Sequence, residues 1–249
     1  MRFSKKVAVA SERYSRQVIL DGFGSEKQKI LSESTVGILG VGGLGCPAAT
    51  YLAGAGIGKL ILVDSQSPEE SNLNRQILHW PEDIGERSKS ESAAWKLKRF
   101  NPDINIIEKT MEVTEDNIKE IFMDANLILD CTDNFLTRMI LNKYCINSST
   151  PFIHAAVESW HGQITTIIPK ITPCLKCIFP NLPPAKKIFP IIGPAAGIFG
   201  SLQASEAIKI LTGTGDPLTS KLLIGDVQYN QWDIIEIGKR ENCPACKIA

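Results

Sequence analysis

Four glycines lie close together in one short segment, with a spacing that is typical of phosphate-binding turns. The segment reads Gly40-Val-Gly42-Gly43-Leu-Gly45 and lies between an apolar run and a helical pattern. Such glycines let backbone amides and the positive end of a helix approach a phosphate. Asp64 follows about 20 residues later, where a carboxylate that binds ribose hydroxyls is expected. The spacing predicts a nucleotide site, and a turn that only packs a helix against a strand is the plain alternative.

Positive charge and amides gather in the next part of the chain. The segment Ser-Asn-Leu-Asn-Arg-Gln supplies Asn72, Arg75 and Gln76, and Lys89 lies at the start of the next helical pattern. These groups suit phosphates, whereas nicotinamide chemistry needs no such concentration of charge. Asp133, in the segment Asp-Cys-Thr-Asp-Asn, ends the fourth predicted strand, and a carboxylate there can hold Mg²⁺ against phosphate oxygens. The pattern predicts a nucleoside triphosphate and magnesium.

Each of these side chains also has a plain structural interpretation. Arg75 and Lys89 could be solvated surface cations, and Asp130 could simply cap the end of a strand. The ordered set favours the triphosphate site, because a motif counts when its structural context is predicted as well. No catalytic role is predicted for the histidines, which are scattered and form no ligand spacing: His79, His154 and His161.

Two Cys-x-x-Cys pairs predict a metal site. Cys174 and Cys177 form one pair and Cys243 and Cys246 the other, which supplies the four thiolates of a tetrahedral Zn²⁺ site. The protein fills all four positions, so the predicted role is structural. A redox pair is the alternative, although a reactive pair normally lies at a helix start in a thioredoxin-like pattern. The remaining cysteines are predicted to pack in the core: Cys46, Cys131 and Cys145.

Short β-branched runs alternate with helical patterns, which predicts parallel strands joined by crossover helices. The predicted strands are Thr35–Gly40, Lys59–Asp64, Ile104–Lys109, Leu127–Thr132, Phe152–Val157, Gln163–Pro169, Leu222–Val227 and Asp233–Ile237. The predicted helices are Glu12–Leu20, Ser25–Leu31, Leu44–Ala55, Ser88–Phe100, Glu115–Met123, Asn134–Asn147 and Ala195–Leu211. The short link before the sixth strand indicates antiparallel pairing. The predicted fold class is α/β, a Rossmann-like doubly wound mixed sheet with a parallel N-terminal half and antiparallel C-terminal strands.

We expect one domain over residues 1–249. Residues 1–34 hold N-terminal helices, 35–157 the nucleotide-binding half, and 158–249 a second half with the cysteine pairs. Residues 178–193 contain four prolines and are predicted to be a long loop. Long loops of compact domains are usually functional or disordered, and the apolar residues 188–192 favour docking.

The composition excludes several classes of protein. The chain has 249 residues with 27 basic and 27 acidic side chains, so bulk positive charge does not drive binding to nucleic acid or to a membrane surface. No apolar run approaches the ~18 residues of a membrane span. The basic and then apolar start, residues 1–10, is too short for a signal peptide. We therefore expect a cytoplasmic protein.

The ordered motifs, together with the opening Arg-Tyr-Ser-Arg-Gln of residues 13–17, resemble the MoeB/ThiF/HesA family from about residue 12 to residue 246. The resemblance implies ATP-dependent adenylation of the C-terminal Gly-Gly carboxylate of a small ubiquitin-like sulfur carrier, similar to MoaD or ThiS, for molybdopterin or thiamine biosynthesis. It also implies a homodimer in which Arg16 reaches the triphosphate of the other subunit. The remaining site residues that it implies are Gly40, Gly42, Gly43 and Gly45 in the loop, Asp64 on the ribose, Asn72, Arg75, Gln76 and Lys89 on the phosphates, and Asp133 on Mg²⁺.

The chain departs from the family pattern in two places. Gln66 stands where members usually have a second aspartate, which affects one local charge contact. No cysteine lies between Cys177 and Cys243, although thiamine-type members use one there in sulfur transfer. A covalent intermediate on this loop is therefore not expected, which favours a MoeB-like enzyme that stops at the adenylate.

Other functions remain open. An NAD-dependent dehydrogenase would explain the glycines and Asp64 but not Arg75, Lys89 and Asp133. An adaptor that binds a ubiquitin-like protein without activating it would explain the missing loop cysteine. Adenylation of another carboxylate, such as a small molecule, a peptide or a threonyl-carbamoyl group on transfer RNA, would use the same site.

Overall fold

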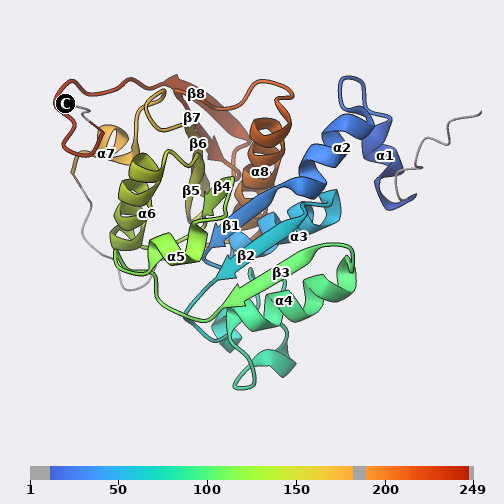
Figure 1. Ribbon diagram of the computed structural model, residues 1–249. Coiled ribbons are helices and arrows are strands. Elements are labelled where there is room, and N and C mark those ends of the chain that lie inside the picture. The colour runs from blue at the N-terminus through green and yellow to red at the C-terminus, as the bar shows by residue number, and fades with distance from the viewer. Residues whose placement is uncertain (1–11, 182–188, 247–249) are drawn as a thin grey trace, which may run out of the picture.

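The computed structural model describes residues 12–181 and 189–246, and eight strands within them form one mixed sheet (Figure 1). The sheet order is β3-β2-β1-β4-β5-β6-β7-β8. Neighbours from β3 to β5 pair in parallel and those from β5 to β8 antiparallel, which confirms the predicted mixed sheet. The strands are β1 Thr35–Leu39, β2 Lys59–Val63, β3 Asn105–Lys109, β4 Leu127–Asp130, β5 Phe152–Glu158, β6 His161–Ile167, β7 Lys221–Asp226 and β8 Gln231–Glu236.

The order of the strands reverses between β1 and β4. After β1 the chain adds β2 and β3 on one side, and it then returns to add β4 and β5 on the other. Leu39 at the end of β1 pairs with Asp130 at the end of β4, so the two following turns start side by side. In open α/β sheets ligands bind outside the carboxyl ends of the strands at this point.

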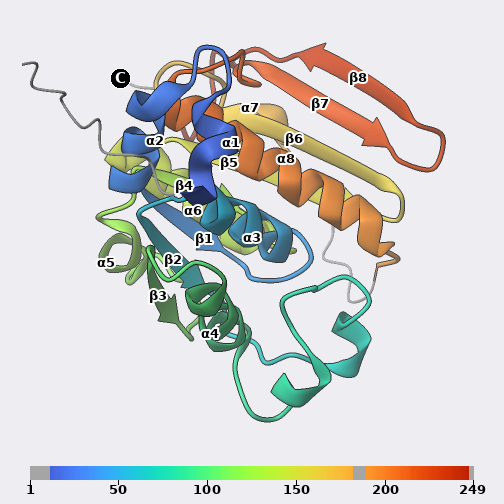
Figure 2. The ribbon, with the colours of Figure 1, turned by 90° about the vertical axis from the view of Figure 1, so that its right-hand side faces the viewer.

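Helices cover both faces of the sheet. Side chains of α3, α4 and α8 contribute to one apolar cluster and those of α5 and α6 to another, and Figures 1 and 2 show these two groups on opposite faces. The α-helices are α1 Ser15–Val18, α2 Gly24–Glu33, α3 Gly45–Ala55, α4 Lys89–Phe100, α5 Ile118–Phe122, α6 Phe135–Ser148, α7 Leu175–Ile178 and α8 Gly193–Thr212, with 3-10 turns η1 Glu12–Tyr14, η2 Glu70–Asn72 and η3 Pro81–Asp83.

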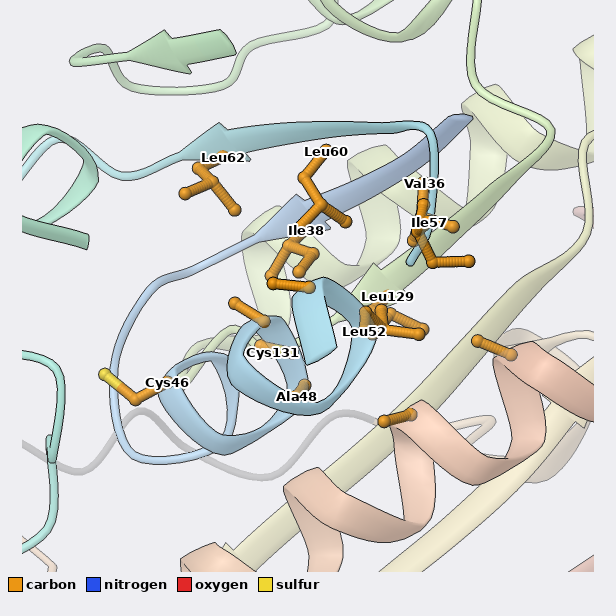
Figure 3. Packing of buried hydrophobic residues seen from close by; sticks show 14 of the residues in the cluster. Val36, Ile38, Cys46, Ala48, Leu52, Ile57, Leu60, Leu62, Leu129 and Cys131 are labelled. Carbon is orange, nitrogen blue, oxygen red and sulfur yellow. The ribbon is translucent and has the colours of Figure 1, made fainter. Parts of the chain in front are cut away.

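The larger apolar cluster anchors the nucleotide-binding half. Ala48 and Leu52 of α3 pack with Ile38 of β1 and Leu60 of β2, and all four are fully buried (Figure 3). Cys46 and Cys131 belong to the same cluster, and Cys145 is buried in the other, so the prediction that these cysteines pack in the core is confirmed. The packing holds α3 rigidly behind the turn that precedes it.

The other predicted elements have the bounds of the sequence pattern to within two residues, but α5 begins three residues later than predicted. Its first predicted turn is replaced by local hydrogen bonds, because the Thr114 amide donates to Asn117 Oδ1 over 2.9 Å. Such side-chain bonds compete with helical ones. The helix therefore begins only at Ile118.

The predicted loop 178–193 is described in part, since residues 182–188 lie outside the described residues. Its last part docks as predicted: the Ser159 amide donates to the Pro190 carbonyl over 2.6 Å, and the Ile192 amide to the Ser159 carbonyl over 3.2 Å. The prediction did not include α7, whose four residues are too few to show a helical pattern.

Across residues 12–181 and 189–246, no helix combines the length and the hydropathy that crossing a membrane requires. The prediction that residues 1–10 are too short for a signal peptide concerns residues that lie outside the described part of the chain.

Candidate active site

The glycine segment connects the end of β1 to the start of α3. Gly40 has φ +92°, and a Cβ atom on it would lie 2.7 Å from the carbonyl oxygen of Cys131. A Cβ atom on Gly45 would lie 2.0 Å from the carbonyl oxygen of Gly40. Only glycine permits these approaches of backbone to backbone. The turn thus brings the N-terminus of α3, whose first amides have no acceptor within the helix, to the carboxyl edge of the sheet.

Asp64 follows β2 and lies against the glycine segment, as the spacing predicts. Its Oδ2 accepts a hydrogen bond from the Val41 amide over 2.8 Å, and its Oδ1 accepts one from the Gln66 amide over 2.9 Å. The side chain is half-buried. A carboxylate has about four lone-pair sites, so two bonds leave capacity for the hydroxyls of a ribose.

The segment after Asp64 folds back over the glycines. A Cβ atom on Gly43 would lie 3.6 Å from Arg75 Cγ, and one on Gly42 would lie 3.6 Å from Gln76 Nε2. Gln76 is buried, and its Oε1 has no hydrogen-bond partner within the described residues. An unsatisfied buried acceptor beside the loop indicates a place where a bound molecule could donate a hydrogen bond.

Arg75 and Asn72 are held mainly by the chain around them. Arg75 Nη1 donates to the Ser71 carbonyl over 2.8 Å and to Asn74 Oδ1 over 3.0 Å. Asn72 is buried, and its Oδ1 accepts from the Glu69 amide over 3.2 Å. The guanidinium keeps further N–H groups for an anion, since it has five.

Lys89 is the first residue of α4, and its side chain is only 4% exposed. Its Nζ donates to Gln66 Oε1 over 2.7 Å, and its amide donates to the Gln66 carbonyl over 2.8 Å. Within residues 12–181 and 189–246 it makes no ion pair with a carboxylate. Gln66 therefore joins Lys89 to Asp64, with its neutral carboxamide on Lys89 and its backbone amide on Asp64, and no carboxylate of the described residues pairs with the buried cation.

The two aspartates that follow β4 have different environments. Asp130 is fully buried: its Oδ1 accepts from the Thr132 hydroxyl over 2.8 Å, and its Oδ2 accepts from His154 Nδ1 over 2.7 Å. Asp133 is exposed, and its side chain has no hydrogen bond or ion pair in the part of the chain that the structure describes. Asp133 is thus available to a metal, whereas Asp130 is committed to the fold.

Arg16 is not brought to this site within one chain. The neighbouring Gln17 donates through Nε2 to the Ala55 carbonyl over 3.1 Å, at the C-terminal end of α3. The glycine segment is at the other end of that 11-residue helix, about 16 Å away. The Arg16 side chain is exposed, so the guanidinium is accessible to another molecule.

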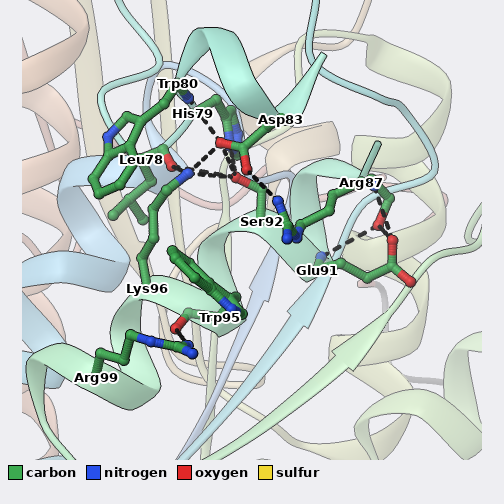
Figure 4. Close-up of polar contacts among 11 residues, drawn as sticks. Leu78, His79, Trp80, Asp83, Arg87, Glu91, Ser92, Trp95, Lys96 and Arg99 are labelled. Atoms are coloured by element: carbon green, nitrogen blue, oxygen red, sulfur yellow. Dashed lines mark hydrogen bonds and ion pairs between the residues drawn. The ribbon is translucent and has the colours of Figure 1, made fainter. Parts of the chain in front are cut away.

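His79 supports the glycine segment, which the sequence did not indicate. Its Nε2 lies 2.8 Å from the Val41 carbonyl, and its Nδ1 lies 3.0 Å from Ser92 Oγ. Ser92 in turn contacts Asp83, and Lys96 pairs with that carboxylate (Figure 4). The carbonyl can only accept, so Nε2 carries the hydrogen. A single apolar-flanked histidine gave no signal for this role.

The nearby Cys46 thiol is not a nucleophile. Its Sγ lies 3.7 Å from His79 Nε2, but burial raises its pKa to about 12. Only the thiolate is reactive, so Cys46 acts as a small buried side chain beneath the loop.

The four cysteines of the two Cys-x-x-Cys pairs converge. Their Sγ atoms all lie within 4.8 Å of one another, with 3.7 Å between Cys174 and Cys243 and 3.4 Å between Cys177 and Cys246. Four ligands at ~2.3 Å from a tetrahedral Zn²⁺ would be ~3.8 Å apart, so the cluster fits this ion. Burial raises the pKa of the Cys174 thiol to about 11, so a bound cation would be needed to hold this sulfur as a thiolate.

Comparisons with known proteins identify the family of the chain. The model of the ThiF family matches residues 14–245. The chain belongs to the ThiF family. The sulfur carrier protein ThiS adenylyltransferase of Escherichia coli K12 is 40% identical over 238 residues, which cover 94% of each protein. The SAMP-activating enzyme E1 of Haloferax volcanii is 36% identical over 244 residues, which cover 96% of this chain and 90% of that one.

A solved structure shares the fold of this ThiF-family chain. The crystal structure of Escherichia coli MccB with ATP superimposes with a TM-score of 0.83 at 25% identity, covering 95% of this chain and 75% of that one. The ThiF family model and the ThiS adenylyltransferase relative confirm the resemblance drawn from the motifs. With relatives of this identity named adenylyltransferases, the chain is an enzyme of that class.

Proposed function

We propose that this enzyme uses ATP and Mg²⁺ to adenylate the C-terminal Gly-Gly carboxylate of a small ubiquitin-like sulfur carrier, with release of pyrophosphate. The observation that carries the proposal is Lys89, a buried cation whose side-chain partner is the neutral carboxamide of Gln66, a residue whose backbone amide in turn contacts Asp64 at the glycine segment. A buried cation without a counter-anion is costly, so the site favours a polyanion. The ThiS adenylyltransferase among the relatives supports a carrier protein as the second substrate.

The reaction needs positioning and positive charge more than proton transfer. The carrier carboxylate, already an anion at neutral pH, attacks the α-phosphorus in line. A carboxylate oxygen to phosphorus bond forms, and the bond from the α-phosphorus to the bridging oxygen breaks, with its electron pair leaving on pyrophosphate. The barrier is chiefly repulsion between two anions, so preorganised cations lower it.

Lys89, Arg75, Mg²⁺ and the Arg16 of a second subunit supply that charge in the proposal. Arg75 lies beside Gly43 of the glycine segment, Lys89 is linked to it through Gln66 and Asp64, and Asp64 orients the ribose. Asp133 would hold Mg²⁺, which neutralises phosphate charge when bound. Arg16 would complete the site from the second subunit of a homodimer, since its own chain places it at the far end of α3.

The sheet offers a surface for the body of the carrier. Trp232 and Ile234 of β8 are 43% and 60% exposed, and they share the face of the sheet on which the Trp232 ring lies 5.8 Å from that of Phe199. Leu223 pairs with Ile234 across the hairpin and lies on the same face. We propose that this apolar face of β7 and β8, seen beyond α8 in Figure 2, holds the carrier.

The product is the free acyl adenylate of the carrier. No cysteine lies between Cys177 and Cys243 to form a covalent intermediate on the intervening loop. The four-cysteine cluster would bind Zn²⁺ as a structural ion, because all four positions belong to the protein. The pathway served, molybdopterin or thiamine, would follow from the carrier.

Exchange of labelled pyrophosphate into ATP tests the proposal. We expect exchange with a small carrier ending in Gly-Gly, because its acyl adenylate reacts back with labelled pyrophosphate to give ATP. The same carrier lacking its last glycine should give none, because it forms no acyl adenylate. Exchange that appears with a free amino acid and not with the carrier would show that the enzyme adenylates a small molecule instead. Binding of reduced nicotinamide without binding of ATP would overturn the proposal altogether.

A further inference from the structure

The turn that leads from β4 to Asp133 is held by a buried polar cluster. All three polar groups of Thr132 are engaged: its amide and hydroxyl donate to Asp130 Oδ1 over 3.2 and 2.8 Å, and its carbonyl accepts from Arg138 Nη2 over 2.5 Å. Arg138 Nε lies 3.7 Å from Asp130 Oδ2, which closes the cluster into a ring. Thr132 directly precedes Asp133, so the ring determines the direction in which the chain enters that residue.

The cluster is deeply buried. Asp130 and His154 are fully buried, and Arg138 is 6% exposed. Arg138 Nε and His154 Nε2 have no hydrogen-bond partner among the described residues. Buried polar atoms without a hydrogen-bond partner and buried ion pairs contribute little to stability and are often replaceable by apolar side chains. Stability alone therefore does not account for the cluster.

The same turn also touches the glycine segment. A Cβ atom on Gly40 would lie 2.7 Å from the Cys131 carbonyl oxygen and 3.3 Å from the Thr132 amide. Gln203 of α8 anchors the strand ends from behind, donating through Nε2 to the Asp130 carbonyl over 2.8 Å. The backbone of residues 131–132 is thus fixed between the cluster and the phosphate-facing turn.

We propose that Asp130 and Arg138 are positioning residues, which hold Thr132 so that the Asp133 carboxylate faces a magnesium-bound triphosphate at the glycine segment. This inference rests on the proposed function, because it assigns Mg²⁺ to Asp133. Asp130 itself does not reach the ion, since it is fully buried, its Oδ1 accepts two hydrogen bonds from Thr132, and its Oδ2 contacts His154 and Arg138. The two aspartates of this segment therefore have different roles: Asp130 orients the turn, and Asp133 binds the metal.

Substitutions at Thr132 test the inference with little disturbance of the fold. Thr132→Val removes only the hydroxyl that donates to Asp130, whereas Thr132→Ser keeps it. The readout is the factor by which Mg²⁺ tightens ATP binding in equilibrium dialysis, with and without chelator. We expect Thr132→Val to lower this factor about 10-fold, the worth of one hydrogen bond to a charged group, while ATP binding in chelator is unchanged. Thr132→Ser should retain the wild-type factor.

Two further variants keep the test decisive. Arg138→Met should lower the same factor at least as much, and Cys145→Ala, a buried change on the same helix, should leave it unchanged even if it lowers the melting temperature. If folded Thr132→Val and Arg138→Met both keep the wild-type factor, the inference is wrong although the proposed function stands. If the wild-type protein binds ATP equally with and without Mg²⁺, the magnesium assignment of the proposed function fails, and the inference fails with it.

Discussion

Gln66 lies between the charges of Asp64 and Lys89. Its backbone amide donates to Asp64 Oδ1, and its side-chain Oε1 accepts from Lys89 Nζ. An aspartate at this place, usual in the family that the motifs resemble, would pair with Lys89 and weaken its field at the phosphates. With glutamine the positive charge stays uncompensated, which favours a polyanion in the site.

Asp133→Ala should lower turnover in pyrophosphate exchange by ~10²–10³-fold, the effect of losing one preorganised electrostatic group. ATP binding in chelator should change little, because the carboxylate acts through Mg²⁺. Asp103→Ala is the matched control: it removes an exposed carboxylate just before β3, at the opposite edge of the sheet. Unchanged exchange by the Asp133 variant would remove this residue from the site.

Two buried histidines should make the protein sensitive to mild acid. Burial, which outweighs their hydrogen bonds, lowers the pKa of His79 and of His154 below the ordinary 6.5. The unfolded chain then binds more protons than the native one below about pH 6.5, so the free energy of unfolding falls as pH drops from 7 to 5, with a limiting slope of ~1.4 kcal/mol per pH unit for each histidine.

Urea unfolding at several pH values measures this slope. His154→Asn can still donate to Asp130 through its amide and should show a shallower slope between pH 7 and 5. Asp130 adds to the trend only at much lower pH: its burial is outweighed by His154 and Arg138, which lower its pKa, so its stabilising contribution is lost in strong acid. An equal slope in both proteins would show that His154 is protonated in the native state.

At the scale of elements, the start of α3 is the part of the fold that creates the phosphate-facing turn. The apolar face of α3 is packed against β1 and β2, so the helix cannot move to relieve a clash at its N-terminus. The turn before it depends on the missing side chains of Gly40 and Gly45. Rigid packing behind and close backbone contact in front together hold the amides in place.

Gly45→Ala should destabilise the protein by about 1–3 kcal/mol, since its Cβ atom would overlap the Gly40 carbonyl. ATP affinity should fall as well. Gly197→Ala within α8 is the control, because a Cβ atom there meets nothing within 4 Å and alanine favours a helix by about 0.5–1 kcal/mol. Urea unfolding distinguishes the two, and a stable Gly45 variant with normal ATP affinity would contradict the account of the turn.

The cysteine cluster ties α7 to the C-terminal segment, and its removal should loosen both. We expect one Zn²⁺ per chain by atomic absorption, and a large fall in melting temperature on chelation, because structural zinc is worth ~10–16 kcal/mol in apparent binding free energy. Cys243→Ser should reproduce the loss, whereas Cys145→Ser, outside the cluster, should keep the metal. A metal-free wild-type protein with unchanged stability would refute the structural zinc.

For the molecule as a whole, the position of α1 bears on its assembly. α1 lies at the C-terminal end of α3, so the exposed Arg16 lies far from the glycine segment of its own chain. A second copy related by a two-fold axis would present the same residue to its partner, as isologous dimers do. The proposed site is complete only if each chain supplies its Arg16 to the active site of the other.

Mixing two inactive variants tests that exchange. Arg16→Ala and Asp133→Ala homodimers should each show little pyrophosphate exchange. After subunit reassortment, half of the dimers should be mixed, and one of their two sites should carry both wild-type residues, so about one quarter of the wild-type activity should return. No recovery despite proven reassortment would place Arg16 outside the active site.

Local order in the sequence determined most of the fold. The eight strands were predictable because each is a short β-branched run between turn residues, and the glycine segment was predictable because backbone contact excludes every other residue type. The same holds for the chemistry of the four cysteines, whose type and spacing already indicate a metal. These features depend on neighbours along the chain, which a single sequence displays.

Only the tertiary structure decided which of several similar residues does what. Asp130 and Asp133 belong to one segment, but β4 buries the first against Arg138 and His154 and leaves the second exposed. His79 contacts the Val41 carbonyl only because the folded chain brings these distant residues together, and no local sequence pattern indicates that contact. Burial and long-range hydrogen bonds arise from packing between distant segments, so they set the roles of residues whose types the sequence leaves equivalent.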